Sequence, residues 1–157
     1  GAHSFYRGGA FAVYEAEARR AARAVSDAFD EGQLVSVLDA ALRTSWTREP
    51  VWVHGDVAAT NLLVRDGDLG AVIDFGCCAV GDPACDLTIA WTFFAEEARA
   101  AFQRAWPDDP DLWARARGWA LWKALITLVG ARREGRQEVA DSARAVIATV
   151  VAEHRSA

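Results

Sequence analysis

One stretch constrains the fold of this 157-residue chain more than any other: residues 51–86, VWVHGDVAATNLLVRDGDLGAVIDFGCCAVGDPACD. Short apolar runs alternate there with four polar signals: His54-Gly55-Asp56, Asn61, Asp74-Phe75-Gly76 and Gly81-Asp82-Pro83. The apolar runs are too brief for helices and are typical of short strands. We therefore expect a small β platform whose loops carry the polar side chains.

The pattern predicts three strands in this stretch: Val51–Val53, Leu62–Val64 and Leu69–Ile73. The sequence Arg-Asp-Gly-Asp between the last two is a tight-turn signal, which joins them in a hairpin. An antiparallel pair returns the chain to its starting point. Asn61 and Asp74 are therefore expected at the same end of the hairpin.

Helices are predicted on both sides of the stretch, which makes the fold α+β and mostly helical. Asp82-Pro83 and Asp109-Pro110 are helix start signals, because Asp caps the first turn and Pro fits the first helical position. Periodicity and propensity place the helical segments at residues 10–24, 33–43, 83–94, 96–106, 110–133 and 139–151. The segment 110–133 is apolar around much of its circumference, which predicts burial on several sides. Residues 1–9 are predicted to be a loop.

Length and composition indicate one soluble globular domain. The net charge of −5 and the sequence pI near 5.2 argue against a nucleic-acid-binding face and suit a cationic small molecule. No apolar run approaches the roughly 18 residues of a membrane span, and no segment resembles a signal peptide. The three cysteines, Cys77, Cys78 and Cys85, lack metal-site spacing and favour reduced thiols in a cytoplasmic protein.

Three polar residues of the central stretch suit a metal-dependent reaction centre. Asp56, at a strand end, can accept a proton from a substrate hydroxyl. Asn61 offers a neutral oxygen and Asp74 an anionic one, and both suit Mg²⁺. Each residue alone is explained better as a turn or strand cap. The three together, in this order and spacing, favour a reaction centre.

The series His-Gly-Asp-x-x-x-x-Asn, Ile-Asp-Phe-Gly and Gly-Asp-Pro-x-x-Asp-Leu resembles the aminoglycoside phosphotransferase family, the antibiotic and choline kinase branch of the kinase-like superfamily. The resemblance covers residues 51–87. It implies a protein-kinase-like C-terminal lobe in which a small β-hairpin platform carries the catalytic loop. It also implies ATP and Mg²⁺ as cofactors and a small-molecule hydroxyl, such as that of an aminoglycoside-type antibiotic, as the phosphoryl acceptor.

The same resemblance implies a role for each matching residue. Asp56 would be the catalytic base that orients the acceptor hydroxyl. Asn61 and Asp74 would hold Mg²⁺ on the ATP phosphates. His54 would support the catalytic loop, and Asp86 would bond back to the backbone of that loop.

Several features separate the chain from a complete protein kinase. Gly55 stands where a protein kinase carries an arginine that pairs with a phosphorylated activation loop, and residues 76–83 are too few for such a loop. No G-x-G-x-x-G sequence occurs, and the single lysine, Lys123, lies in the long apolar helix and not on a strand. We therefore expect residues 1–157 to be one domain: the catalytic and substrate-binding C-terminal lobe, with the N-terminal nucleotide lobe absent.

Two alternatives stay open. The first alternative to the catalytic lobe is a truncated, catalytically incompetent lobe that acts as a folded binding module. The second is a metal-dependent hydrolase built on Asp56, Asp74 and Asp82. Substrate-binding residues are not assigned, because solvated surfaces and core packing explain the candidates at least as well. The candidate carboxylates are Glu96, Glu97, Asp27, Asp30 and Glu31. The candidate stacking residues are Trp91, Trp106, Trp113, Trp119 and Trp122.

Overall fold

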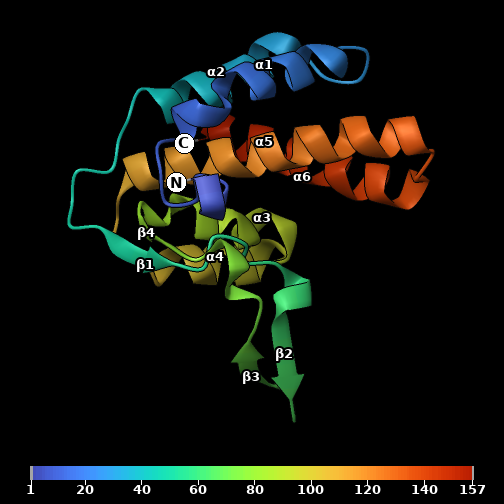
Figure 1. Cartoon of the computed structure of the whole chain (residues 1–157). Coiled ribbons are helices and arrows are strands. Elements are labelled where there is room, and N and C mark those ends of the chain that lie inside the picture. The colour runs from blue at the N-terminus through green and yellow to red at the C-terminus, as the bar shows by residue number, and fades with distance from the viewer. Residues whose placement is uncertain (1, 157) are drawn as a thin grey trace.

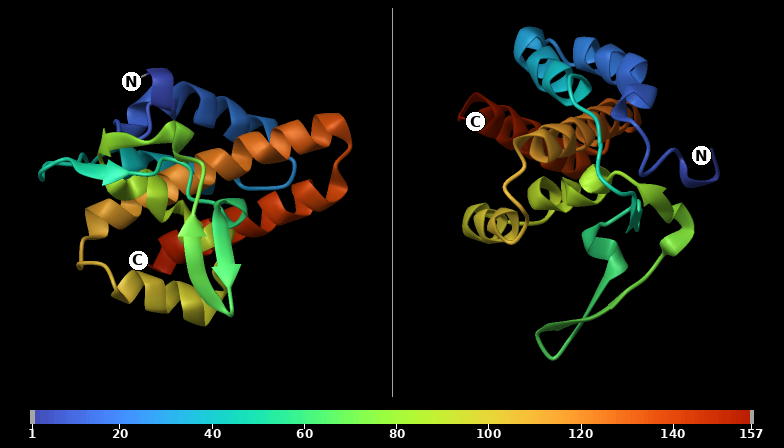
Figure 2. Two further views of the ribbon diagram at one scale, coloured as in Figure 1. Left: turned by 60° about the horizontal axis from the view of Figure 1, so that its bottom comes forward. Right: turned by 90° about the vertical axis from the view of Figure 1, so that its left-hand side faces the viewer.

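The computed structural model describes residues 2–156 and has three layers (Figure 1). The middle layer is the antiparallel pair of long helices α5 (Pro110–Glu134) and α6 (Gln137–Ser156). Helices α1 (Glu15–Ala24) and α2 (Glu31–Leu42) cover one side of this pair. The short helices α3 (Ile89–Thr92) and α4 (Glu96–Arg104) and all the strands lie on the other side, as the right-hand view of Figure 2 also shows.

Helix α5 is the centre of the core, because it packs against α1, α2, α6 and the turn that precedes α3. Its start follows the predicted signal: the Asp109 side chain accepts a hydrogen bond from the Leu112 N–H at 2.9 Å, and Pro110 occupies the first turn. The largest side chains of α5 that are almost fully buried are Trp119, Leu121, Leu125 and Leu128. Burial of such side chains contributes about 1.5–3 kcal/mol each. No helix within residues 2–156 is long and apolar enough to span a membrane.

The strands form two separate two-stranded antiparallel sheets. Strand β1 (Val51–Val53) pairs with β4 (Ala79–Gly81), and β2 (Leu62–Arg65) pairs with β3 (Asp68–Val72). The β2–β3 hairpin is the one predicted from the turn signal. It projects away from the helical layers in Figures 1 and 2, with most of its apolar side chains exposed.

Some predictions of local structure are wrong. The segment 83–94 is not one helix: Pro83–Thr88 is a tight 3₁₀ helix, and only Ile89–Thr92 is α-helical. The Asp86 carboxylate in this segment accepts hydrogen bonds from the backbone N–H groups of His54 and Gly55. Tertiary contacts therefore set the geometry of the segment 83–94. Strand β4 was missed because Ala-Val-Gly carries no periodic signal and its pairing with β1 is long-range. Residues 2–4, predicted as loop, form a short 3₁₀ turn.

Candidate active site

The segment that follows β1, residues 54–61, is termed the Asp56 loop below, and Asp86 anchors its beginning. The Asp86 carboxylate accepts hydrogen bonds from the backbone N–H groups of His54 and Gly55, each at 2.7 Å. Burial raises the pKa of Asp86, although these two N–H groups act in the opposite direction. The bonds fix the backbone immediately before Asp56, as expected for a brace behind the loop.

His54 connects the Asp56 loop to the end of the hairpin through both ring nitrogens. Its Nε2 lies 2.8 Å from the Ile73 carbonyl oxygen, which can only accept, so Nε2 carries a hydrogen. Its Nδ1 then accepts the hydrogen bond of the Asp56 backbone N–H at 3.2 Å. The His54 ring also packs against Phe75, with ring centroids 4.7 Å apart. His54 thus supports the loop from inside the fold.

Asn61 joins the same two segments from the other end of the loop. Its side-chain Nδ2 donates to the Asp56 carbonyl oxygen at 2.9 Å, and its own carbonyl oxygen accepts from the Ile73 N–H at 3.0 Å. Asn61 is buried, and its amide oxygen has no hydrogen bond to the described residues. The backbone contact with Ile73 places Asn61 and Asp74 at the same end of the hairpin, as the sequence predicts.

Asp74 has a left-handed backbone, with φ 65° and ψ 61°, which is uncommon for a residue other than glycine. Its side chain is exposed and has no hydrogen bond or ion pair within the described residues. Strained backbone positions of this kind cluster at functional sites. The Asp74 carboxylate is therefore open to a cation.

The oxygens of Asn61 and Asp74 fit Mg²⁺, which prefers hard oxygen ligands and is commonly held by one or two side chains plus substrate phosphates. Residues 2–156 contain no cluster of three or more His, Cys, Asp or Glu side chains suited to a metal.

Lys123 is the site residue that the sequence reasoning missed. Its Nζ donates to Asp56 Oδ1 at 2.7 Å, across 67 residues of chain. Burial would raise the pKa of Asp56, but the hydrogen bond and charge of Lys123, helped by Arg7, lower it below the usual 3.8. The pair therefore stabilises the fold above pH 3.8, and this contribution is lost as the pH falls through the lower pKa of folded Asp56. The available signal was that Lys123 is the one charged residue in the mainly apolar segment 118–131 of α5.

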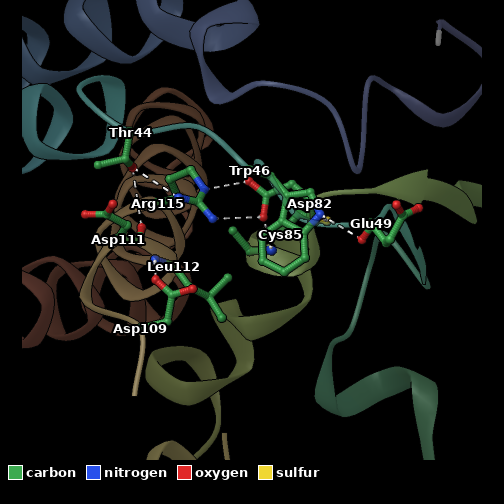
Figure 3. A network of polar contacts seen from close by, with 10 residues as sticks. Thr44, Trp46, Glu49, Asp82, Cys85, Asp109, Asp111, Leu112 and Arg115 are labelled. Atoms are coloured by element: carbon green, nitrogen blue, oxygen red, sulfur yellow. Dashed lines mark hydrogen bonds and ion pairs between the residues drawn. The ribbon is translucent and has the colours of Figure 1, made fainter. Parts of the chain in front are cut away.

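Asp82 does not join the other acidic residues of the site. Its Oδ1 accepts the Ala84 N–H at 3.1 Å, so it caps the helix as predicted, and its Oδ2 accepts from Arg115 Nε at 2.7 Å. Figure 3 shows Arg115 reaching from α5 to this carboxylate, and Arg115 Nη1 also donates to Thr44 Oγ1 at 3.2 Å. Asp82 and Arg115 are both buried. The hydrolase alternative therefore lacks its third carboxylate.

The candidate acceptor-binding carboxylates have other partners or stay on the surface. Asp30 caps α2, Asp27 pairs with Arg132 at 2.8 Å, and Glu31 pairs with Arg23 at 3.4 Å. Glu96 and Glu97 are exposed in the first turn of α4. Of the five tryptophans, Trp119 and Trp122 line a small cavity beside Asp56, whereas Trp106 and Trp113 line a different one and Trp91 bonds to Glu153.

Gly55 is required by the close packing of the Asp56 loop. Its φ is 83°, and a Cβ atom there would overlap the Cys77 carbonyl oxygen and lie 2.9 Å from the Arg7 Cβ. Gly55→Ala is therefore expected to lower the free energy of unfolding by more than the roughly 1–2 kcal/mol of a left-handed alanine. Gly130→Ala is the control, because that helical glycine has open space around it and should gain about 0.5–1 kcal/mol. Equal free energies of unfolding for Gly55→Ala and Gly130→Ala, measured by urea unfolding, would contradict this packing.

Two comparisons with known proteins give matches to this chain. A model of a phosphotransferase enzyme family matches residues 3–119. A solved structure, the apo form of a thermostable mutant of aminoglycoside phosphotransferase APH(4)-Ia, is similar over 76% of this chain, with 22% identity and a TM-score of 0.51. The match covers 44% of that protein, so the chain spans less than half its length. No curated protein sequence matches significantly. The structural likeness supports the predicted fold class.

Proposed function

Because the chain belongs to this phosphotransferase enzyme family, we propose that it is the catalytic lobe of an enzyme that transfers the terminal phosphoryl group of ATP to a small-molecule hydroxyl. The resemblance drawn from residues 51–87 is confirmed at the level of the family. The nucleotide, the metal and the acceptor are parts of the proposal.

The observation that carries the proposal is the double contact of Asn61. Its side chain holds the Asp56 carbonyl and its backbone holds Ile73, next to Asp74. The proposed base, Asp56, and one proposed Mg²⁺ ligand, Asn61, are therefore hydrogen-bonded to each other, and the second proposed ligand, Asp74, follows Ile73 in the chain. Asp56 would orient the acceptor hydroxyl, and Asn61 and Asp74 would hold Mg²⁺, which when bound neutralises phosphate charge. Phosphoryl transfer needs little more than such positioning and neutralisation, since its transition state is loose.

A nucleotide-binding lobe would complete this site. The sequence has neither a G-x-G-x-x-G loop nor a lysine on a strand, which are the parts that grip ATP in protein kinases. The sheets carry exposed apolar side chains, including Trp52, 78% exposed, and Val64, 70% exposed. Apolar surface of this kind is typical of an interaction site. We propose that the missing lobe packs there, and the enzyme containing both lobes is called the complete enzyme below.

An aminoglycoside-type polycation is the first acceptor to test. The chain has a net charge of −5, which favours binding of a cation. The similar solved structure is that of an aminoglycoside phosphotransferase. A cytoplasmic location, which would supply ATP, is consistent with the three free thiols.

Asp74→Ala tests the metal assignment in the complete enzyme. The variant is expected to raise the KM for Mg²⁺·ATP at least about tenfold, because loss even of an outer-shell partner typically costs 10–100-fold. Asp68→Ala, an exposed carboxylate on the same hairpin, is the control and should leave the KM unchanged. Steady-state kinetics over a range of Mg²⁺ concentrations gives the comparison. An unchanged Mg²⁺ dependence in Asp74→Ala would remove Asp74 from the metal site.

The non-catalytic alternative makes a different prediction. A binding module would leave the complete protein folded and able to bind the acceptor, but no acceptor would be phosphorylated with ATP and Mg²⁺. A transfer assay with radiolabelled ATP over aminoglycosides, macrolides and choline-like alcohols separates the two. Calorimetric titration of residues 1–157 alone with Mg²⁺·ATP is expected to show little or no heat.

A further inference from the structure

The Asp56 loop contains no lysine or arginine. The residues between Asp56 and Asn61 are Val-Ala-Ala-Thr. The cation in contact with Asp56 comes instead from α5, where Lys123 Nζ lies 2.7 Å from Asp56 Oδ1. Both side chains are 37% exposed, so the contact is only partly screened by water.

Lys123 lies on α5, the helix at the centre of the core. The neighbouring Trp119 and Trp122 of α5 are buried. The Trp122 Nε1–H donates to Glu17 on α1 at 2.7 Å, and the Arg7 guanidinium lies over the Trp122 ring at 5.0 Å from its centroid. A group on a packed helix is held more exactly in place than one on a loop. The backbone position of Lys123 is therefore set by the core, and the contact with Asp56 holds its ammonium group.

The contacts of Asp56 leave one oxygen open. Its backbone N–H donates to His54 and its carbonyl accepts from Asn61, so its main chain is fixed on both sides. Lys123 holds Oδ1, and within the described residues Oδ2 has no hydrogen-bond partner. Among the described residues, Lys123 is thus the hydrogen-bond partner that fixes the Asp56 carboxylate.

Given the phosphoryl transfer proposed above, we infer that Lys123 is a positioning residue: it holds Asp56 Oδ1 so that Oδ2 accepts the hydrogen bond of the acceptor hydroxyl. A carboxylate paired with an ammonium group is a weak base. It suits a reaction in which the hydroxyl is oriented first and gives up its proton late, as a loose transition state allows. The reaction then depends on the direction of Oδ2 more than on the basicity of Asp56.

The first test needs no catalysis and uses residues 1–157. The pKa of Asp56 is measured by carboxyl ¹³C NMR titration in wild type, Lys123→Met and Lys123→Arg. Lys123→Met should raise this pKa, because burial remains while the ammonium group is lost. Lys123→Arg should keep it low. Arg132→Met is the control, since Arg132 lies on the same helix and pairs with the distant Asp27. An unchanged Asp56 pKa in Lys123→Met would overturn the inference.

The second test uses the complete enzyme. Lys123→Met should lower kcat by up to about 100-fold, the cost of a small misplacement of a reacting group. The KM for Mg²⁺·ATP should stay unchanged, the acid limb of the kcat–pH profile should move to higher pH, and Lys123→Arg should recover most of kcat. An active wild type whose kcat and pH profile survive Lys123→Met overturns the role of Lys123 alone. An inactive wild type overturns the proposed function and the role together.

Discussion

Asp56→Ala is expected to lower kcat of the complete enzyme by about 10²–10⁴-fold, the range that a positioned proton acceptor contributes. The carboxylate is the group at the loop centre that can orient the acceptor hydroxyl, and its backbone stays bonded to His54 and Asn61 in the variant. The effect should therefore fall on turnover and leave the fold intact. Initial rates of ADP formation, with circular dichroism as the check on folding, give the measurement.

Asp27→Ala is the matched control for this substitution. Asp27 also pairs with a cation on α5, Arg132, at 2.8 Å, but it lies on the surface away from the Asp56 loop. Its removal should leave kcat unchanged. Near-normal kcat in Asp56→Ala would disprove the assignment of Asp56 as the base. Equal losses of kcat in Asp56→Ala and Asp27→Ala would instead indicate that removing any ion pair with α5 lowers kcat.

The largest effect on stability is expected from Asp82→Ala, at about 3–5 kcal/mol, the usual cost of leaving one member of a buried ion pair alone. Arg115 is 3% exposed, and its Nε would lose the carboxylate 2.7 Å away. The helix cap to Ala84 would be lost as well. Urea unfolding of residues 1–157, followed by tryptophan fluorescence, gives the free energy.

Two further variants separate the ion pair from the cap. Asp109→Ala removes a similar cap at the start of α5. Because Arg48, the ion-pair partner of Asp109, is mainly exposed, this variant should lower the free energy of unfolding by only about 0.5–2 kcal/mol. The double variant Asp82→Ala/Arg115→Met removes both buried charges and should regain part of the stability. If Asp82→Ala cost no more than Asp109→Ala, the buried pair would contribute little.

Local signals predicted the parts of the fold that depend on nearby residues. The Asp-Pro pair at 109–110 predicted the start of α5, and the Asp-Gly turn predicted the β2–β3 hairpin that brings Asn61 beside Ile73. These features follow from capping and turn chemistry, which act within a few residues.

The parts that were missed depend on residues far apart in the chain. Strand β4 exists because β1 offers it an edge, and the 3₁₀ turn at 83–88 contains an Asp86 bonded to the Asp56 loop. The Lys123–Asp56 pair exists only after α5 has docked against that loop. No periodicity or spacing within one segment encodes such contacts, so Asp56 could be named as a candidate base from the sequence, whereas its contact with Lys123 could not.

The β2–β3 hairpin has a mechanical consequence. It projects from the helical layers, and Ile73 at its base is tied to His54 through its carbonyl and to Asn61 through its N–H. Both of those residues in turn hold the main chain of Asp56. Ile73 thus couples the hairpin to both residues that hold the main chain of Asp56. A displacement of the hairpin at Ile73 is expected to shift His54 and Asn61 together.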